Sequence, residues 1–308
     1  MDMDPALIAS LLKEVTSAAS QPMPSRSPIR VWSMSGVERL TFPDGTTSIL
    51  KYAREPFTNE DRVLRAAAEA GVPVPRLLGS ARRNGLLVMA LEDLGDPQRE
   101  ATDSEAATAA VRLHAATPPS WLPVLDEETL AALPGRALVR LQRLRAAGRW
   151  TQGTDDLTLH LHALARAAPK LAAGTGLAPF GWAHSEFHSS SLHTGERGWR
   201  LLDFARAFTG PGLLDLAAWQ GLAKADPPDP QRLRALIADY IAAGGPSDAQ
   251  ARRGGLPPER WALGWHRIWA VEWFLEQAHR WIDNPTRDPG SIEVVRRHLA
   301  SAVDLLHA

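Results

Sequence analysis

The spacing of apolar residues changes near Gly95, and this change constrains the fold more than any other feature of the sequence. Before Gly95, short apolar segments alternate with turn residues such as Pro43-Asp44-Gly45, where proline presets its own φ and glycine accepts a positive φ. After Gly95, apolar residues recur mainly at helical spacing. The sequence therefore predicts an α+β fold in which a small β-rich part precedes a larger, mostly helical part.

The apolar pattern also predicts where the elements lie. In the β-rich part, strands are expected at 29–34, 37–42, 48–53, 77–81 and 86–91, with one helix at 58–70. A lead helix at 5–19 and a proline-rich linker come before them. Helices are expected at 104–117, 127–147 and 154–173 and again from 211 to the end, around one island without helical pattern at 181–208. We therefore expect three segments, 1–28, 29–95 and 96–308.

Composition excludes several classes of function. The chain has no cysteine, so disulfides, thiolate metal sites and cysteine nucleophiles are excluded, and any metal must be held by oxygen or imidazole. Lys plus Arg number 34 against 35 Asp plus Glu, a balance that gives no general attraction to nucleic acid or anionic membranes. No apolar run approaches the length of a membrane span, and the N-terminus is acidic. We expect a soluble, cytoplasmic protein, and its oligomeric state stays open.

Lysine is scarce, which makes one lysine informative. Only four lysines occur beside 30 arginines, and Lys51 lies within an apolar strand pattern. A lysine at such a position is more consistent with a functional role than with a snorkelling surface residue.

The island carries a cluster of polar residues at defined spacing. It contains the run His184-Ser185-Glu186-Phe187-His188-Ser189-Ser190-Ser191, and Asp203 follows Ser191 by twelve positions after a short apolar stretch. This pattern resembles the His-Gly-Asp-x-His-x-x-Asn motif and later Asp-Phe-Gly of the aminoglycoside phosphotransferase and choline kinase-like family. Further segments from 30 to 280 match the family in the same order, among them Ser35–Arg39, Ile49-Leu50-Lys51 and Met89–Gly95.

The resemblance implies a two-lobed protein-kinase-like fold and a kinase activity that uses ATP or GTP with Mg²⁺. Phosphoryl transfer depends on positioning and charge neutralisation more than on covalent chemistry. In the nucleotide-binding lobe at 29–95, the resemblance assigns Lys51 to the phosphates, Glu60 to an ion pair with Lys51, and Gly36 to a turn over the phosphates. It also implies that the backbone at Glu92 to Leu94 meets the base.

In the helical lobe at 96–308, the resemblance implies a catalytic loop at 184–193 and a metal-binding segment at 203–205. Its expected catalytic residues are Glu186, His184 and His188, and the expected metal ligands are Ser191 and Asp203. Here His184 would orient the loop, and Asp215 would brace it from the following helix.

Two of these residues differ from the family motif. Glu186 replaces the family's catalytic Asp and is one methylene longer, and Ser191 replaces the metal-binding Asn and would bind Mg²⁺ weakly or through water. Ser185 replaces a glycine, adding a Cβ where the backbone needs an unusual φ. Two hypotheses therefore stay open: an active small-molecule kinase, or a degenerate relative that binds nucleotide or a partner without turnover.

Other chemistries fit less well. The spacing His184-x-Glu186-x-His188 differs from the zincin motif His-Glu-x-x-His, and the following serines are poor helix formers. Gly174-Thr-Gly176 lacks the third glycine of a dinucleotide-binding turn.

Tryptophans bear on the acceptor. Trp261, Trp265, Trp269 and Trp273 recur every four residues and predict a stripe on one helix that mainly forms core. By resemblance, the late helices line the acceptor pocket, so Trp269 and Trp273 are candidate substrate contacts. From residue 211 onward, 12 acidic and 11 basic residues are present, which does not favour a polycationic aminoglycoside. We expect a hydroxyl acceptor with an apolar part, an antibiotic-like compound or biosynthetic intermediate, with a peptide Ser or Thr as a further option.

Overall fold

The computed structural model describes residues 3–18, 23–221, 227–282 and 284–308. These form two compact units, one from Met1–Ala101 with Ser190–Ala207 and one from Thr102–Ser189 with Phe208–Ala308. The functional division at 1–28, 29–95 and 96–308 stays a prediction. In the packing of the structure, residues 190–207 belong to the first unit, and the lead helix also packs in this unit.

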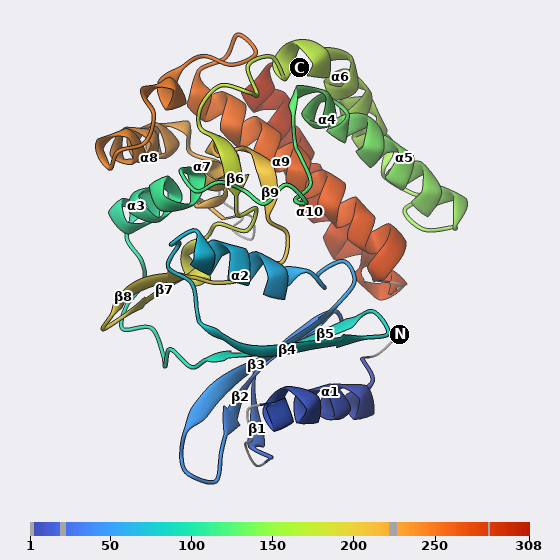
Figure 1. The fold of residues 1–308 in the computed structure, drawn as a ribbon. Helices are drawn as coiled ribbons and strands as arrows, with labels where there is room; N and C mark the ends of the chain where they lie inside the picture. Colours follow the sequence, from blue (N-terminus) through green and yellow to red (C-terminus); the bar gives the residue numbers. More distant parts are fainter. Residues whose placement is uncertain (1–2, 19–22, 222–226, 283) are drawn as a thin grey trace. The chain divides into compact units, whose positions relative to one another are not determined.

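The first unit is built on a five-stranded antiparallel sheet. Its order is β1-β2-β3-β5-β4, with β1 at Ser25–Val31, β2 at Ser35–Thr41, β3 at Thr47–Arg54, β4 at Leu77–Arg83 and β5 at Leu86–Glu92. Helix α1 (Pro5–Ala18) covers one face, and helix α2 (Glu60–Glu69) lies on the other (Figure 1). A hairpin of β7 (Leu192–Gly195) and β8 (Gly198–Leu201) completes the unit.

Alternation along β3 explains why the two faces differ. Leu50 and Tyr52 point into the apolar core beneath α1, together with Leu11 and Leu12 of that helix. Because successive side chains of a strand point to opposite faces, Lys51 points to the other face. Burial of these apolar side chains therefore fixes the direction of Lys51.

An ion pair between an exposed arginine and a buried glutamate links the first three strands. The Arg26 guanidinium lies 2.7 Å from the Glu38 carboxylate, and the Tyr52 hydroxyl donates to the same carboxylate at 2.9 Å. Hydrogen bonding from Arg26 outweighs the effect of burial and lowers the pKa of Glu38. This cluster holds the edge strand β1 on the sheet.

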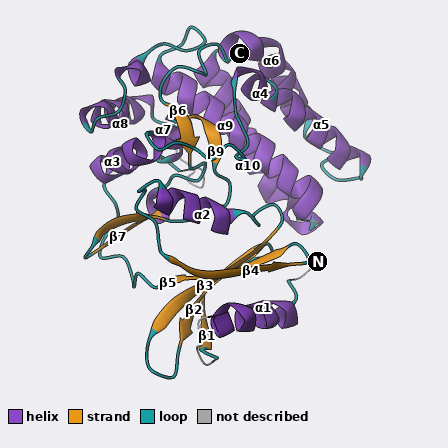
Figure 2. Ribbon diagram, in the orientation of Figure 1, coloured by secondary structure: helices purple, strands orange, loops and turns teal. Residues whose placement is uncertain are grey.

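The second unit is mostly helical, as Figure 2 shows. Its α-helices are α3 (Asp103–His114), α4 (Glu127–Ala131), α5 (Leu133–Ala146), α6 (Asp155–Leu171), α7 (Leu213–Ala218), α8 (Pro230–Ala242), α9 (Pro258–Glu276) and α10 (Asp288–Leu306). A two-stranded sheet joins β6 (Phe180–Ala183) and β9 (Phe208–Pro211). None of the helices among the described residues is long and apolar enough to cross a membrane.

Helix α9 packs against α5, α7, α8 and α10. Trp261 and Trp265 are fully buried, and both indole N–H groups donate to the Leu171 carbonyl, at 2.7 and 3.2 Å. The interpretation of the stripe as core therefore holds for these two residues. A π-helical turn at Gln277–Trp281 follows α9.

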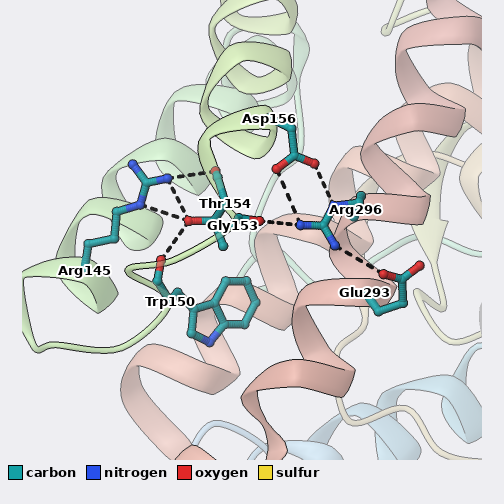
Figure 3. Close-up of polar contacts among 7 residues, drawn as sticks. All are labelled: Arg145, Trp150, Gly153, Thr154, Asp156, Glu293 and Arg296. Atoms are coloured by element: carbon teal, nitrogen blue, oxygen red, sulfur yellow. Dashed lines mark hydrogen bonds and ion pairs between the residues drawn. The ribbon is translucent and has the colours of Figure 1, made fainter.

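Arginines fasten the long helices to the loop between α5 and α6 (Figure 3). Arg145 of α5 donates to the Thr154 carbonyl at 2.7 Å, and Arg296 of α10 donates to the Gly153 carbonyl at 2.5 Å. Arg296 also pairs with Asp156, in the first turn of α6, at 2.7 Å. Thr154 in turn donates to the Trp150 carbonyl. These bonds provide hydrogen-bond partners for polar groups of the loop.

Several predicted boundaries were wrong. β1 begins at Ser25 instead of residue 29, because proline is compatible with an edge strand and all seven residues of β1 are exposed, which removes the alternating pattern. The helix expected at 127–147 is two helices, α4 and α5, which meet at Ala132. Pro134 lies in the first turn of the second helix, where proline is well tolerated.

Candidate active site

Lys51 lies between two carboxylates in the first unit. Its Nζ is 2.7 Å from Oε1 of Glu60 on α2 and 2.7 Å from Oδ1 of Asp203, which follows the β7–β8 hairpin. The side chain of Glu60 is 1% exposed, whereas that of Asp203 is 32% exposed. The structure therefore brings together three of the predicted residues, with only Asp203 substantially open to solvent.

The charges of this trio depend on one another. Burial opposes the charged form of Lys51, but Asp203 and Glu60 outweigh it and raise the lysine's pKa. Burial raises the pKa of Glu60 to about 7 against the opposing effect of Lys51. Glu60 Oε1 also accepts the Phe204 N–H at 3.2 Å, and its Oε2 is buried without a hydrogen-bond partner among the described residues. With both carboxylates ionised, the trio carries one excess negative charge, which suits a bound cation.

A cavity of about 300 Å³ in the first unit has Lys51, Glu60 and Asp203 in its wall. The rest of the wall is largely apolar and includes Ile29, Val37, Ile49, Leu91 and Leu202. The size and the few convergent polar groups are typical of a small-molecule site. An apolar slot next to a lysine and a carboxylate fits a nucleotide with its counter-ion.

Glu92 and Leu94 border the same cavity. The Glu92 N–H donates to the Arg76 carbonyl at 2.9 Å, and the Glu92 carboxylate accepts the Arg76 N–H at 3.0 Å. Between Glu92 and Leu94, the carboxylate of Asp93 accepts a hydrogen bond from Arg39 Nε at 2.7 Å. The segment is therefore held in place from both sides, and its contact with a base stays a prediction.

Gly36 does not lie in a turn, which corrects the expectation for Ser35–Arg39. These residues belong to β2, and the tight connection is at Trp32, whose N–H donates to the Ser35 carbonyl at 3.0 Å. A Cβ on Gly36 would lie 2.2 Å from Cζ of Tyr52. The glycine is therefore required here by the tyrosine ring on the neighbouring strand.

Ser191 immediately precedes β7 and Asp203 follows β8, so both residues lie at the open end of the β7–β8 hairpin. Ser191 is fully buried, and its carbonyl accepts the Leu202 N–H at 2.8 Å. Asp203 itself has a φ of +66°, an unusual value for a residue with a side chain. The hairpin thus brings the two predicted metal ligands to the same end of one small element.

In the second unit, Asp215 of α7 anchors the start of the predicted catalytic loop. Its two carboxylate oxygens accept the His184 N–H at 2.7 Å and the Ser185 N–H at 2.9 Å. Asp215 is fully buried, as is Phe187, whose ring centroid lies 5.6 Å from that of Trp219. These two contacts fix the loop on either side of Glu186.

Glu186 and His188 are half-buried, whereas His184 is fully buried. Trp269 is half-buried, with its ring 5.1 Å from that of Phe208, and Trp273 is 8% exposed. The catalytic and acceptor-binding roles assigned to these residues stay predictions.

Two supporting residues were missed by the sequence analysis. His114 Nε2 lies 3.3 Å from the Asp215 carboxylate, and its Nδ1 lies 3.2 Å from the Tyr240 hydroxyl. A Cβ on Gly212 would lie 2.6 Å from the His114 ring, so Gly212 leaves room for the imidazole. The segment Leu113-His114-Ala115 also resembles the family and could have pointed to His114, whereas the sequence around Tyr240 carries no such signal.

Solved structures of kinases share this fold. An amicoumacin kinase in complex with AMP-PNP, Ca²⁺ and Ami has a TM-score of 0.60 and 13% identity, covering 98% of this chain and 96% of that one. A choline/ethanolamine kinase family protein from Mesorhizobium loti has a TM-score of 0.60 and 17% identity, covering 96% and 98%. An aminoglycoside phosphotransferase from Alicyclobacillus acidocaldarius has a TM-score of 0.56 and 14% identity, covering 100% and 95%. The predicted kinase-like α+β fold is therefore confirmed.

The family is also confirmed. The model of the phosphotransferase enzyme family (APH) matches residues 36–256, which is well over half of the chain. The chain belongs to this family. No curated protein sequence matches it significantly.

Proposed function

We propose that the protein is an ATP- and Mg²⁺-dependent kinase that transfers the γ-phosphate to a hydroxyl group of a small molecule. The observation that carries this proposal is the position of Lys51, 2.7 Å from both Glu60 and Asp203, in the wall of a cavity of about 300 Å³. Phosphoryl transfer needs a lysine for the phosphates and an acidic metal ligand next to it. Family membership supports the same reaction class.

The residues of the first unit fit a nucleotide with a metal ion. Lys51 would bind the phosphates while Glu60 holds its ammonium group, and the segment from Glu92 to Leu94 would meet the base. Asp203 would be the main ligand of Mg²⁺, with Ser191 beside it, since oxygen ligands suit this hard cation. Bound Mg²⁺ would neutralise charge on the phosphate oxygens.

The second unit supplies the proposed base. Glu186 would accept the proton of the acceptor hydroxyl, and its position depends on the N–H groups of His184 and Ser185, which Asp215 holds. His188 would stabilise the loop by hydrogen bonding. A glutamate reaches one methylene further than the family's aspartate, so the acceptor hydroxyl would sit correspondingly further from the loop backbone.

The proposed acceptor carries an apolar part. Trp269 and Trp273 of α9 offer aromatic surface, and the near balance of charges after residue 211 does not select a polycation. Among the solved structures that share the fold, one is an amicoumacin kinase in complex with Ami, and another is a ternary complex of APH(2″)-IIa with streptomycin and ATP. We include an antibiotic, a biosynthetic intermediate and a peptide hydroxyl among the acceptors to be tested.

The test measures Mg²⁺-dependent ATP consumption and phosphorylated product over a panel of such hydroxyl acceptors. We expect turnover with the wild-type protein, a loss of at least about 100-fold in Glu186→Gln, and partial activity in Glu186→Asp. Glu128→Gln, which removes an exposed carboxylate from α4, is the matched control and should be unchanged.

Nucleotide binding measured in parallel separates the two open hypotheses. Binding of ATP without turnover for any acceptor, unaffected by Glu186→Gln, would favour the degenerate, non-catalytic relative. Failure to bind any nucleotide would contradict the kinase and would leave only the degenerate relative that binds a partner.

A further inference from the structure

Arg30 lies in the same row of the sheet as Lys51. In the register of the antiparallel strands, Arg30 pairs with Val37, and Val37 pairs with Lys51. Residues directly opposite each other in antiparallel strands project to the same face, so Arg30 and Lys51 face the same side two strands apart. At one strand spacing per step, their backbones are about 10 Å apart.

A bulge in β1 directs Arg30 to the cavity. The register of β1 on β2 shifts between Pro28 and Arg30, which leaves Ile29 as the extra residue. Bulges change the direction of neighbouring side chains. As a result, the consecutive residues Ile29 and Arg30 both border the cavity that contains Lys51 and Asp203.

The cations around this cavity differ in what they already bind. Lys51 is shared by Glu60 and Asp203, and Arg39 binds Asp93 and Asp96. Arg30 is exposed, and its guanidinium has no hydrogen-bond or ion-pair partner in the part of the chain that the structure describes. It is therefore the cation of this cavity wall whose charge is available to a ligand.

The turn after Arg30 increases the need for such a cation. Kinases commonly cover the phosphates with a glycine-rich loop, and successive backbone N–H groups can form a concave anion site. Here the connection from Arg30 to Ser35 contains no glycine, and the Trp32 N–H is bonded to the Ser35 carbonyl. Part of the backbone that could bind phosphate is thus already used, whereas an arginine side chain can offer several donors in a planar fork.

We infer that Arg30 binds the polyphosphate chain of the nucleotide as a second cation beside Lys51. This inference rests on the nucleotide site proposed above and adds a residue to it. Arg30 would contribute to the affinity for nucleoside di- and triphosphates and would not contribute to the affinity for the nucleoside.

The experiment compares binding of adenosine, ADP and ATP to the full-length protein by calorimetry. The variants are Arg30→Gln and Arg30→Lys, with thermal unfolding recorded for each. Lys13→Gln is the control, because it removes one positive charge from the same unit at an exposed position of α1, on the opposite face of the sheet. We expect Arg30→Gln to bind ATP and ADP about tenfold more weakly, the size of a lost hydrogen bond to a charged group. Its adenosine affinity should equal that of the wild type.

Arg30→Lys keeps the positive charge but loses the planar guanidinium group. Its affinity for ATP and ADP should lie between those of the wild type and Arg30→Gln. If Arg30→Gln loses no more ATP affinity than Lys13→Gln, the role of Arg30 is wrong, while the nucleotide site itself stands. Equal losses for adenosine and ATP would also overturn it, because they would indicate a general distortion of the cavity. A wild-type protein that binds neither adenosine nor ATP would overturn the proposed function together with this inference.

Discussion

Lys51 Nζ and Asp203 Oδ1 lie 2.7 Å apart although 152 positions separate them in the chain. Glu60 makes a second ion pair to the same ammonium group from a fully buried position. Removing the lysine would leave a buried carboxylate without its counter-ion, which is strongly destabilising. We expect Lys51→Met to lower the free energy of unfolding by about 3 kcal/mol, measured by urea denaturation.

A double variant checks the cause of this loss. Lys51→Met with Glu60→Gln removes both charges and should recover at least half of the lost stability, because no buried charge remains unpaired. Lys13→Met on the exposed side of α1 should change stability by less than about 0.5 kcal/mol. No recovery in the double variant would contradict the buried ion pair as the source.

The contact of Asp215 with the loop at His184 and Ser185 gives a second prediction. Asp215→Asn replaces one acceptor oxygen by an NH₂ group that faces a backbone N–H. We expect a loss of about 2 kcal/mol in stability from the unsatisfied donor. A larger fall in kcat than in the affinity for ATP should accompany it, because Asp215 lies outside the nucleotide cavity.

Asp239→Asn, at an exposed position of α8, is the matched control for Asp215→Asn and should leave both properties unchanged. Full activity in Asp215→Asn at unchanged stability would show that the loop does not depend on these two bonds.

Ser185 has a φ of +75°, and its hydroxyl is buried without a partner among the described residues. Glycine removes both penalties at the cost of some backbone entropy. We expect Ser185→Gly to raise the free energy of unfolding by about 1 kcal/mol. Ser301→Gly in α10 should instead lower it by about 0.5 kcal/mol, because that serine is helical. If Ser185→Gly lowers the free energy of unfolding as Ser301→Gly does, the backbone at Ser185 is not strained.

The sequence predicted the parts of the fold where burial alternates. β2 was expected nearly at its observed bounds because every second residue is buried, and β3 because a short, largely buried apolar segment follows the turn at Pro43-Asp44-Gly45. α2 was expected because its apolar residues recur at helical spacing. β1 was placed too late because its seven residues are all exposed and its position depends on pairing with β2. Hydrogen bonding to a neighbouring strand leaves no periodic signal in the sequence of an edge strand.

In the candidate site, too, some residues could be predicted from the sequence, whereas others depend on contacts with neighbouring strands. Lys51, Glu60 and Asp203 could be named in advance from lysine scarcity and the family motif, and the structure places them in contact. The need for Gly36 could not be explained from sequence, because the tyrosine ring that excludes a Cβ lies on the next strand. Arg30 was also not recognised, since its direction depends on a bulge and on a two-strand register.

Gly36 and Tyr52 provide a test of that register. A Cβ at Gly36 would overlap the tyrosine ring at 2.2 Å, and the ring is held by its hydroxyl bond to Glu38. We expect Gly36→Ala to cost about 2 kcal/mol through overpacking. Combined with Tyr52→Leu, it should cost less than the sum of the single changes, by about 1 kcal/mol.

Gly135 in α5 is the control for Gly36, since a Cβ there meets nothing within 4 Å. Gly135→Ala should stabilise the protein by about 0.5 to 1 kcal/mol, as expected for a helical position. Additive effects of Gly36→Ala and Tyr52→Leu would contradict the predicted overlap.

His298 of α10 predicts how stability depends on pH. Its ring is buried against Phe274, with centroids 6.0 Å apart, and Nε2 has no partner among the described residues. Burial, followed by the charges of Arg267 and Arg297, lowers the pKa of His298 from 6.5 to about 3. The unfolded chain therefore takes up a proton below pH 6.5 that the folded protein does not, so stability is lost as pH falls from 6.5 toward 3.

One such group costs about 1.4 kcal/mol per pH unit in this window, or about 2 kcal/mol between pH 7 and pH 5. Burial also lowers the pKa of His266, and this histidine should add to the slope. We expect His298→Gln to lose about 2 kcal/mol less than the wild type between pH 7 and pH 5, in urea denaturation at each pH. His162→Gln, at an exposed position of α6, should keep the wild-type slope. If His298→Gln keeps it too, His298 is not the group that makes the folded protein sensitive to acid.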